Sequence, residues 1–461
     1  MNTRRFSITL PATPASAFAW HAQPGALPRL LPPWDATRVR SRHGDLRDGQ
    51  VVLEVRQGPV RISWDARHEP DAFIEGEQFV DHQQSGPFAH WRHVHRMTSG
   101  PDPGTSTLLD HVTYQLPADP WSRLGTRVVD ATLRRMFAYR HWVTHADLAR
   151  HRETPPMRIA VTGASGLVGG ALLPFLSGGG HQIVRLVRGT PTTPDEHRWS
   201  PESGIVEVDR LGPIDAVIHL AGENVAGRRW TPSFKARIRD SRVGPTRALA
   251  RSLAAATHTP AVLISASAIG LYGDRGDETL TEASAAGTGF LASVGQEWEA
   301  AASPASDAGI RVVHARFGII LDARGGALAK MRLPFSLGLG GPLGTGRQYY
   351  SWVSMEDVLG ALLYATTRDD LRGPINVTSP QPVTNAEFTR TLGRVLKRPA
   401  VIPVPALALT ALFGEMAQAE LLGSKRVLPA ALERAGFEFR LPHLEDALRH
   451  TLGRREVAPD A

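Results

Sequence analysis

The chain has 461 residues, of which 42% are hydrophobic and 21% charged, a balance typical of folded proteins and unlike that of disordered ones. A chain of this length is expected to divide into about two or three domains. The absence of cysteine excludes disulfides, thiolate metal ligands and a cysteine nucleophile, and it fits the cytoplasmic location that we expect. Since no apolar run is long enough to cross a bilayer, we expect no membrane span.

The net charge of +7 raises the question of nucleic-acid binding. Only four of the 52 basic residues are lysines, and the arginines are scattered among acidic residues rather than gathered in a stripe. Nucleic-acid binding needs a continuous basic face, which this distribution does not indicate. We therefore expect no nucleic-acid partner.

Short runs of alternating apolar and polar residues dominate residues 1–153, beginning with Phe6, Ile8 and Leu10. Because glycine and proline separate the runs, the pattern predicts antiparallel strands joined in a meander. A longer segment, residues 124–148, repeats its apolar positions at helical spacing. Further strands are expected at residues 51–55, 60–64, 73–79, 91–95 and 108–114.

Three motifs in this first region are Pro11 with Ala17-Phe18 and Trp20, then Gly86 to His95, then Met136 to His141. On these motifs residues 1–153 resemble the START-like (SRPBCC, polyketide-cyclase-like) helix-grip domains, an α+β fold in which a curved sheet wraps a long helix. The resemblance implies a cavity that holds an apolar small molecule. Thr154-Pro-Pro156 follows as a linker, since paired prolines stop a helix.

Three histidines, His90, His93 and His95, lie on one predicted strand of this region. His93 and His95 share a face of that strand, whereas His90 points the other way. One interpretation is a bound metal ion, and the other is a set of half-exposed strand histidines. Because the run contains no carboxylate, we favour the second interpretation and expect no metal ligands in this chain.

A glycine-rich motif opens the remainder of the chain. A short apolar strand, Ile159 to Val161, leads into Gly163, Gly166 and Gly169, and a helical pattern follows. Such a turn brings backbone N–H groups and a helix N-terminus to the phosphates of a dinucleotide. The alternative is a glycine-rich turn that only joins strand to helix. The flanking strand and helix favour nucleotide binding.

Strands and helices alternate after this motif, with strands expected at residues 158–162, 182–187, 215–219, 261–266 and 310–316. The alternation predicts an α/β fold, a Rossmann-like doubly wound parallel sheet covered by helices on both faces. We expect this domain to span residues 157–372. Residues 373–453 are expected to form a small C-terminal α+β lobe on the substrate side.

The end of the second strand of a Rossmann fold selects between the two nicotinamide cofactors. An acidic residue there binds the ribose 2′-hydroxyl, whereas an arginine accommodates a 2′-phosphate. This strand ends at Arg188, and no acidic residue precedes Asp195. A solvated arginine is the alternative, but guanidinium–phosphate pairing suits the position, so we predict NADP (NADPH) as the cofactor.

Several later motifs are typical of one family: Ala221 to Asn224, Arg229-Trp230 to Ser241-Arg242, Gly340 to Trp352, Leu412 to Met416, Arg426 to Pro429, and Ala435 to Phe437. On these motifs residues 157–450 resemble an atypical branch of the extended short-chain dehydrogenases, the NAD(P)-dependent epimerase/dehydratase-like proteins. The resemblance implies a small-molecule substrate. It also implies cofactor contacts from Gly163, Ser165, Gly166, Leu167, Val168, Arg188, Leu220, Ala221 and Arg242.

The chain departs from that family at the catalytic pair. Short-chain dehydrogenases use Tyr-x-x-x-Lys on one helix, but residues 289–299 contain neither residue. Ser265 or Ser267 could polarise a carbonyl, with Tyr272 or Glu223 as proton donor. The alternative for Tyr272 is a packed aromatic side chain, because no activating lysine is evident.

Three functions are therefore compatible with the sequence. The leading one is an NADP-dependent oxidoreductase or epimerase acting on a small carbonyl or hydroxyl substrate. The second is a non-catalytic NADP(H) sensor, favoured by the missing Tyr-x-x-x-Lys pair. The third is a carrier of an apolar ligand whose second half reduces that ligand. We favour an enzyme, since a serine pair remains at the strand end.

Overall fold

The structure, a computed structural model, describes residues 1–57, 60–117, 122–200 and 208–460. The chain divides into two compact units. The first unit comprises Met1–Pro155, Pro174–Gly180 and Leu452–Ala461, and the second comprises Pro156–Leu173 and His181–Thr451. Within the described residues, no helix is long and apolar enough to cross a membrane.

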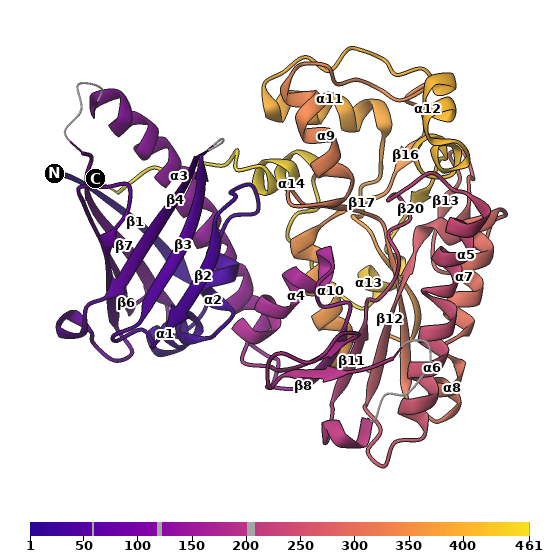
Figure 1. The fold of residues 1–461 in the computed structure, drawn as a ribbon, viewed down its shortest axis with the longest axis horizontal. Helices are drawn as coiled ribbons and strands as arrows, with labels where there is room; N and C mark the ends of the chain where they lie inside the picture. Colours follow the sequence, from indigo (N-terminus) through magenta and orange to yellow (C-terminus); the bar gives the residue numbers. More distant parts are fainter. Residues whose placement is uncertain (58–59, 118–121, 201–207, 461) are drawn as a thin grey trace. The chain divides into compact units, whose positions relative to one another are not determined.

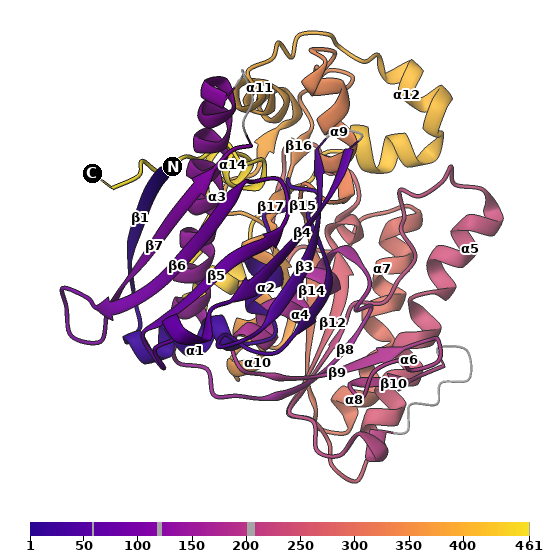
Figure 2. The same cartoon turned by 60° about the vertical axis from the view of Figure 1, so that its left-hand side comes forward.

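The first unit contains a seven-stranded antiparallel sheet in the order β1-β7-β6-β5-β4-β3-β2. Its long helix α3 packs against β1, as Figures 1 and 2 show. This is the predicted helix-grip architecture. The strands are β1 (Asn2–Leu10), β2 (Arg38–His43), β3 (Gln50–Gln57), β4 (Val60–His68), β5 (Gln78–Ser85), β6 (His90–Ser99) and β7 (Ser106–Gln115), and the helices are α1 (Pro14–Ala22), α2 (Ala26–Leu30) and α3 (Ser122–His151).

Alternation in the sequence accounts for most of this sheet. Alternate residues of β6 and β7 are buried, and on β1 the ring of Phe6 stacks on Phe137 of α3 with centroids 4.5 Å apart. The strand expected at residues 73–79 was wrong in position, because a 3-10 turn occupies Pro70–Ala72 and β5 begins at Gln78. β2 was not predicted, because its residues are mostly basic and polar and so do not show the alternation of apolar and polar positions that indicates a strand.

A buried ion pair joins α2 to α3 in the first unit. The guanidinium of Arg29 contacts both carboxylate oxygens of Asp147, with Nε–Oδ2 and Nη2–Oδ1 distances of 2.9 and 2.7 Å. The two side chains are only 5% and 1% exposed. A guanidinium buried this deeply needs a carboxylate partner, because an uncompensated charge in the interior is strongly destabilising.

The second unit is built on a seven-stranded parallel sheet in the order β10-β9-β8-β11-β12-β14-β18. The chain runs outward from β8 to β10 and then crosses to the other side of β8, which is the doubly wound order. Figures 1 and 2 show α6, α7 and α8 on one side of β12 and α10 on the other. The predicted Rossmann-like fold is confirmed.

The elements that form this sheet and its covering layers have the following bounds. The strands are β8 (Arg158–Thr162), β9 (Gln182–Val187), β10 (Glu196–Arg198), β11 (Ala216–His219), β12 (Val262–Ala268), β14 (Arg311–Phe317) and β18 (Gly373–Val377). The helices are α4 (Leu167–Gly178), α5 (Pro232–Asp240), α6 (Val243–Ala254), α7 (Phe290–Ala300), α8 (Ser303–Asp307), α9 (Gly326–Ser336) and α10 (Met355–Thr367).

The C-terminal part differs from its prediction at one strand. β18 pairs with β14 and so belongs to the parallel sheet, although its sequence was assigned to the C-terminal lobe. Its Ile375, Asn376 and Val377 are buried, which suits an edge strand covered by helices. The residues that follow form the helices α11 (Asn385–Leu396), α12 (Ala406–Phe413), α13 (Ala430–Arg434) and α14 (Leu444–Thr451). They also form the short strand β20 (Arg426–Val427), which pairs with the earlier strand β13 (Thr279–Leu280).

We predict that Asp147→Ala destabilises the chain by about 3–5 kcal/mol, because it leaves the Arg29 guanidinium buried without its carboxylate. Urea unfolding of the full chain measures the change. The matched control is Asp370→Ala, which removes an ion pair to Arg368 between side chains 54% and 42% exposed and should change stability little. Equal effects of the two variants would contradict the structural role of the buried pair.

Candidate functional site

Two glycines shape the loop between β8 and α4. Gly163 has φ of 71°, and a Cβ there would lie 2.8–2.9 Å from backbone atoms of Leu220 and Ala221. A Cβ on Gly169 would lie 2.3 Å from the carbonyl oxygen of Gly163. Both positions therefore exclude a side chain. The loop comes close to the turn after β11, at the switch point of the sheet where ligands bind in such folds.

The predicted phosphate-contacting residues lie at the start of α4. Ser165 and Gly166 are exposed, and the helix begins at Leu167, followed by Val168. A helix start with exposed backbone favours an anion, because the first N–H groups of a helix have no intrahelical acceptor. The loop thus has the form that a dinucleotide pyrophosphate requires.

A buried chain of polar side chains fixes the turn after β11. The Thr162 hydroxyl accepts hydrogen bonds from the N–H groups of Leu220 and Ala221, at 3.1 and 3.3 Å. Its Oγ1 lies 2.7 Å from Nδ1 of His219, whose Nε2 lies 3.0 Å from Oγ1 of Thr246. Since the Thr162 oxygen already accepts two bonds, its own proton is free to point at Nδ1, which puts the imidazole proton on Nε2.

Arg242 does not extend away from this turn into open space. Its Nη2 donates to the carbonyl of Glu223 at 2.8 Å and its Nη1 to the carbonyl of Ile238 at 2.9 Å. The guanidinium lies over the Trp298 ring at 5.0 Å and against Gly222. Burial lowers the pKa of Arg242 to about 10. In this structure Arg242 therefore holds the turn, and its contact with a cofactor stays a prediction.

Arg188 lies immediately after β9 and is exposed. In the described part of the chain it has no hydrogen bond or ion pair. Its neighbour Arg185 is different, because Asp195 and Glu196 pair with it at 2.5 and 3.2 Å. Arg188 is thus the arginine at this strand end that is available to an added anion.

The three catalytic candidates lie in or next to one buried network. Ser267 Oγ donates to Glu299 Oε1 at 2.6 Å, and Arg316 makes two bonds of 2.7 Å to the same carboxylate. Arg316 Nη1 also donates to the Tyr272 hydroxyl at 2.8 Å, which in turn donates to Asn376 Oδ1 at 2.8 Å. This network connects β12, α7, β14 and β18, and sequence reasoning did not anticipate it.

The network leaves little freedom for proton transfer by its members. Tyr272 is fully buried, and burial raises its pKa, whereas a proton-transferring tyrosine needs a lowered one. Ser265 is also fully buried, with its Oγ 3.5 Å from the Ala266 carbonyl. Glu223, the other proposed donor, pairs with Arg237 at 2.9 Å. The geometry favours the packed-aromatic interpretation of Tyr272.

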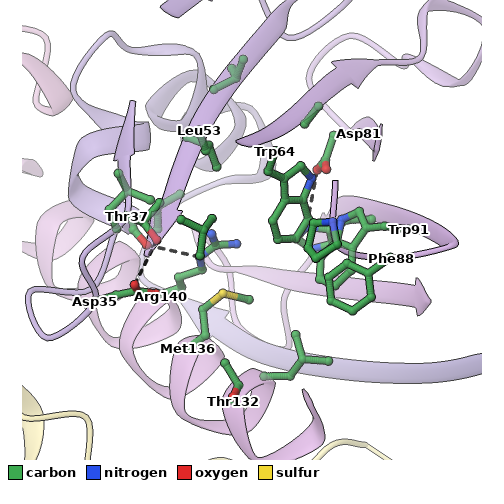
Figure 3. A pocket seen from close by; sticks show the side chains of 18 of the residues that line it. Asp35, Thr37, Leu53, Trp64, Asp81, Phe88, Trp91, Thr132, Met136 and Arg140 are labelled. Carbon is green, nitrogen blue, oxygen red and sulfur yellow. Dashed lines mark hydrogen bonds and ion pairs between the residues drawn. The ribbon is translucent and has the colours of Figure 1, made fainter. Parts of the chain in front are cut away.

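The first unit encloses a cavity of about 860 Å³. Figure 3 shows the rings of Trp64, Phe88 and Trp91 gathered on one wall, and Met136 on α3. The indoles of Trp64 and Trp91 meet edge to face, with centroids 4.9 Å apart. The predicted cavity between sheet and helix is present, and its volume and lining suit an apolar small molecule.

Polar residues also line this cavity, among them Asp81, and sequence reasoning missed both Asp81 and the buried Asp110. Asp81 on β5 and Asp110 on β7 lie beside His93 and His95 of β6. Burial by itself raises the pKa of the Asp110 carboxyl. The surrounding histidines nevertheless hold that pKa well below its usual value. The sequence contained a signal for both aspartates, because each lies an even number of residues from inward-facing apolar residues of its own strand. Asp81, for example, lies two residues after Phe79.

Comparison with known proteins identifies the family. Residues 159–378 match the model of the NAD dependent epimerase/dehydratase family. An epimerase family protein of Mycobacterium bovis is 47% identical over 296 residues, which cover 64% of this chain and 98% of the relative. The chain belongs to the epimerase/dehydratase family. Residues 10–137 match the polyketide cyclase / dehydrase and lipid transport model, and residues 404–451 match a domain of unknown function.

Solved structures of family members agree with this assignment. A nucleoside-diphosphate sugar epimerase of Corynebacterium glutamicum is 35% identical with a TM-score of 0.82, and the match covers 99% of this chain and 91% of that one. The human epimerase family protein SDR39U1, solved with NADPH, is 32% identical with a TM-score of 0.60. That match covers 64% of this chain and 99% of the human chain. The START-like and epimerase-like resemblances predicted from the sequence are thus confirmed.

We predict that His219 makes stability depend on pH. Burial lowers its pKa to about 4 in the folded chain, whereas an unfolded histidine titrates near 6.5. Acid therefore protonates the unfolded state first, and stability is lost as pH falls from about 6.5 toward 4. Between pH 7 and pH 5 the stability of the parent chain relative to His219→Gln should fall by about 2 kcal/mol in urea unfolding. A difference independent of pH would contradict this.

Proposed function

We propose that the second unit binds NADP(H) and acts as an oxidoreductase or epimerase on a small carbonyl or hydroxyl substrate. The observation that carries the cofactor proposal is the approach of Gly163 to Leu220 and Ala221, which leaves room for backbone but not for a side chain. The exposed start of α4 supplies donors for the pyrophosphate, and Gly163, Ser165, Gly166, Leu167 and Val168 are the proposed contacts.

The choice of NADP over NAD rests on Arg188. The side chain is exposed and unpaired among the described residues, at the position where a 2′-phosphate is recognised in this fold. The human relative was solved with NADPH, which supports the same choice. Leu220 and Ala221 are the proposed flanks of the adenosine half, whereas Arg242 is proposed to support them from behind.

The nicotinamide supplies a hydride when it is bound, and the chain's own residues must bind the substrate and move a proton. Ser265, Ser267 and Tyr272 remain the candidates, and Ser267 has the clearest link to a charged group, through Glu299. The cavity of the first unit is proposed to bind an apolar ligand, in keeping with its aromatic lining.

The alternative function is a non-catalytic NADP(H) sensor. One observation favours it: Arg316 and Asn376 occupy both hydrogen-bonding positions of the Tyr272 hydroxyl, and α7 carries no tyrosine or lysine. A sensor needs the cofactor loop but no proton donor, so the two functions differ in turnover and not in binding.

We predict that Arg188→Ala weakens NADPH binding roughly ten- to hundredfold and leaves NADH binding nearly unchanged, because charge-assisted bonds to the 2′-phosphate are lost. Isothermal titration with each cofactor measures this. Arg251→Ala is the control, since Arg251 is also exposed but lies in the last turn of α6, away from the carboxyl ends of the strands. Equal weakening of both cofactors would refute the 2′-phosphate assignment.

We predict that the purified chain oxidises NADPH or reduces NADP when it is supplied with deproteinised cell extract, and that Arg188→Ala loses most of this turnover at low cofactor concentration. Nicotinamide absorbance gives the rate, and fractionation of the extract leads to the substrate. Nucleoside-diphosphate sugars form a defined second panel, because the Corynebacterium relative bears that name. Tight NADPH binding with no turnover in either assay would favour the sensor.

A further inference from the structure

The register of the first unit's sheet brings four polar side chains to one point on its inner face. Asp81 of β5 pairs directly with His93 of β6, and His95 of β6 pairs directly with Asp110 of β7. Because residues two apart on a strand share a face, His93 and His95 are neighbours, with ring centroids 3.8 Å apart. His93, His95 and Asp110 are buried, so this is an interior cluster and not a surface one.

The two imidazoles turn one nitrogen each toward Asp81. His93 Nδ1 lies 3.5 Å and His95 Nε2 lies 3.6 Å from the same oxygen, Oδ2 of Asp81. Both distances exceed the usual N–H···O length, so any hydrogen bond between Asp81 and these imidazoles is long. Ligand atoms 2.0–2.1 Å from a tetrahedral metal ion are separated by roughly 3.3–3.4 Å, close to these values. All three ligand atoms lie within 4.8 Å of one another, which is the spacing of atoms that could share one metal ion.

The opposite nitrogens of both rings are turned toward a second carboxylate. His93 Nε2 donates to Asp110 Oδ1 at 2.9 Å, and His95 Nδ1 lies 2.8 Å from the same oxygen. Asp110 Oδ2 accepts from His141 Nε2 at 2.8 Å, which holds the carboxylate from α3. A carboxylate behind a histidine is the usual support of a metal ligand, because it fixes the tautomer and directs the free lone pair at the metal.

We propose that Asp81, His93 and His95 bind a divalent transition-metal ion of the zinc class in the cavity of the first unit. The donor set of two imidazoles and one carboxylate is one that zinc accepts, and three protein ligands leave a fourth position open. All three residues line the cavity, so the open position faces the space that an apolar ligand would fill. Asp110 is a positioning residue, since it acts through the two imidazoles.

Electrostatics supports the same assignment. Asp110 is buried and Asp81 is only 20% exposed, so both carboxylates need nearby positive charge. A dication supplies it while both imidazoles stay neutral, which is the form that binds a metal. The interpretation of His93 and His95 as half-exposed strand histidines is wrong for this fold, since both are buried and carboxylates from the neighbouring strands complete the cluster.

The decisive experiment uses the full chain without a histidine tag, stripped with a chelator and titrated with Co²⁺ and then Zn²⁺. We expect one equivalent of Co²⁺ to give the visible absorption of a tetrahedral site, and Zn²⁺ to abolish that absorption by displacement. Binding of less than a stoichiometric amount, or a spectrum typical of six-coordinate Co²⁺, would overturn the proposal. This titration uses only the parent chain, so its result does not depend on whether a variant folds.

Variants then assign the ligands. Asp81→Asn and His95→Gln should each weaken Co²⁺ at least about 100-fold, and Asp110→Asn about 10- to 100-fold, as expected for a supporting residue. His90→Gln is the matched control, because His90 lies on the same strand with its side chain on the other face. Circular dichroism and NADPH binding by the second unit verify that each variant is folded. Equal weakening in His90→Gln, or none in Asp81→Asn, would refute the assignment.

Discussion

The close approach of the β8–α4 loop to the turn after β11 is the constraint on which the candidate site of the second unit depends. Gly163 can approach Leu220 only because it has no side chain, and the Thr162 hydroxyl ties the two strand ends together by accepting from the turn's backbone. His219 extends this contact inward to Thr246 of α6. The two strand ends at the switch point, far apart in the sequence, are therefore held together by hydrogen bonds.

The same unit differs from short-chain dehydrogenases that have the tyrosine–lysine pair in how it uses its buried polar groups. Where the family pairs a tyrosine with a lysine, this chain has a carboxylate, Glu299, held by Arg316 and Ser267. That network satisfies every charged group it contains, so it stabilises the contact between α7 and the sheet. It also holds the Tyr272 hydroxyl between Arg316 and Asn376 by hydrogen bonds.

The first unit shows the complementary case, in which an apolar cavity contains a polar cluster. Aromatic rings cover much of the cavity, but polar side chains also line it, among them Asp81, His93 and His95. Removing the carboxylates of Asp81 and Asp110 largely or wholly from water costs free energy unless each has partners, and here the register of adjacent strands provides them. Because forming this polar cluster on the inner face of a sheet costs desolvation free energy, we expect it to bind a ligand.

Local patterns in the sequence determined which segments form strands and helices, and they identified the glycine loop and the helix-grip and Rossmann-like folds. The absence of the tyrosine–lysine pair was also evident from the sequence. These features depend on residues close together in the chain, where period and turn chemistry act directly. Tertiary structure alone decided that Tyr272 is bound by Arg316, that Arg242 turns inward, and that β18 joins the sheet. It also decided that Asp81 and Asp110 meet the histidines of β6, because strand register is set by long-range packing that no single segment encodes.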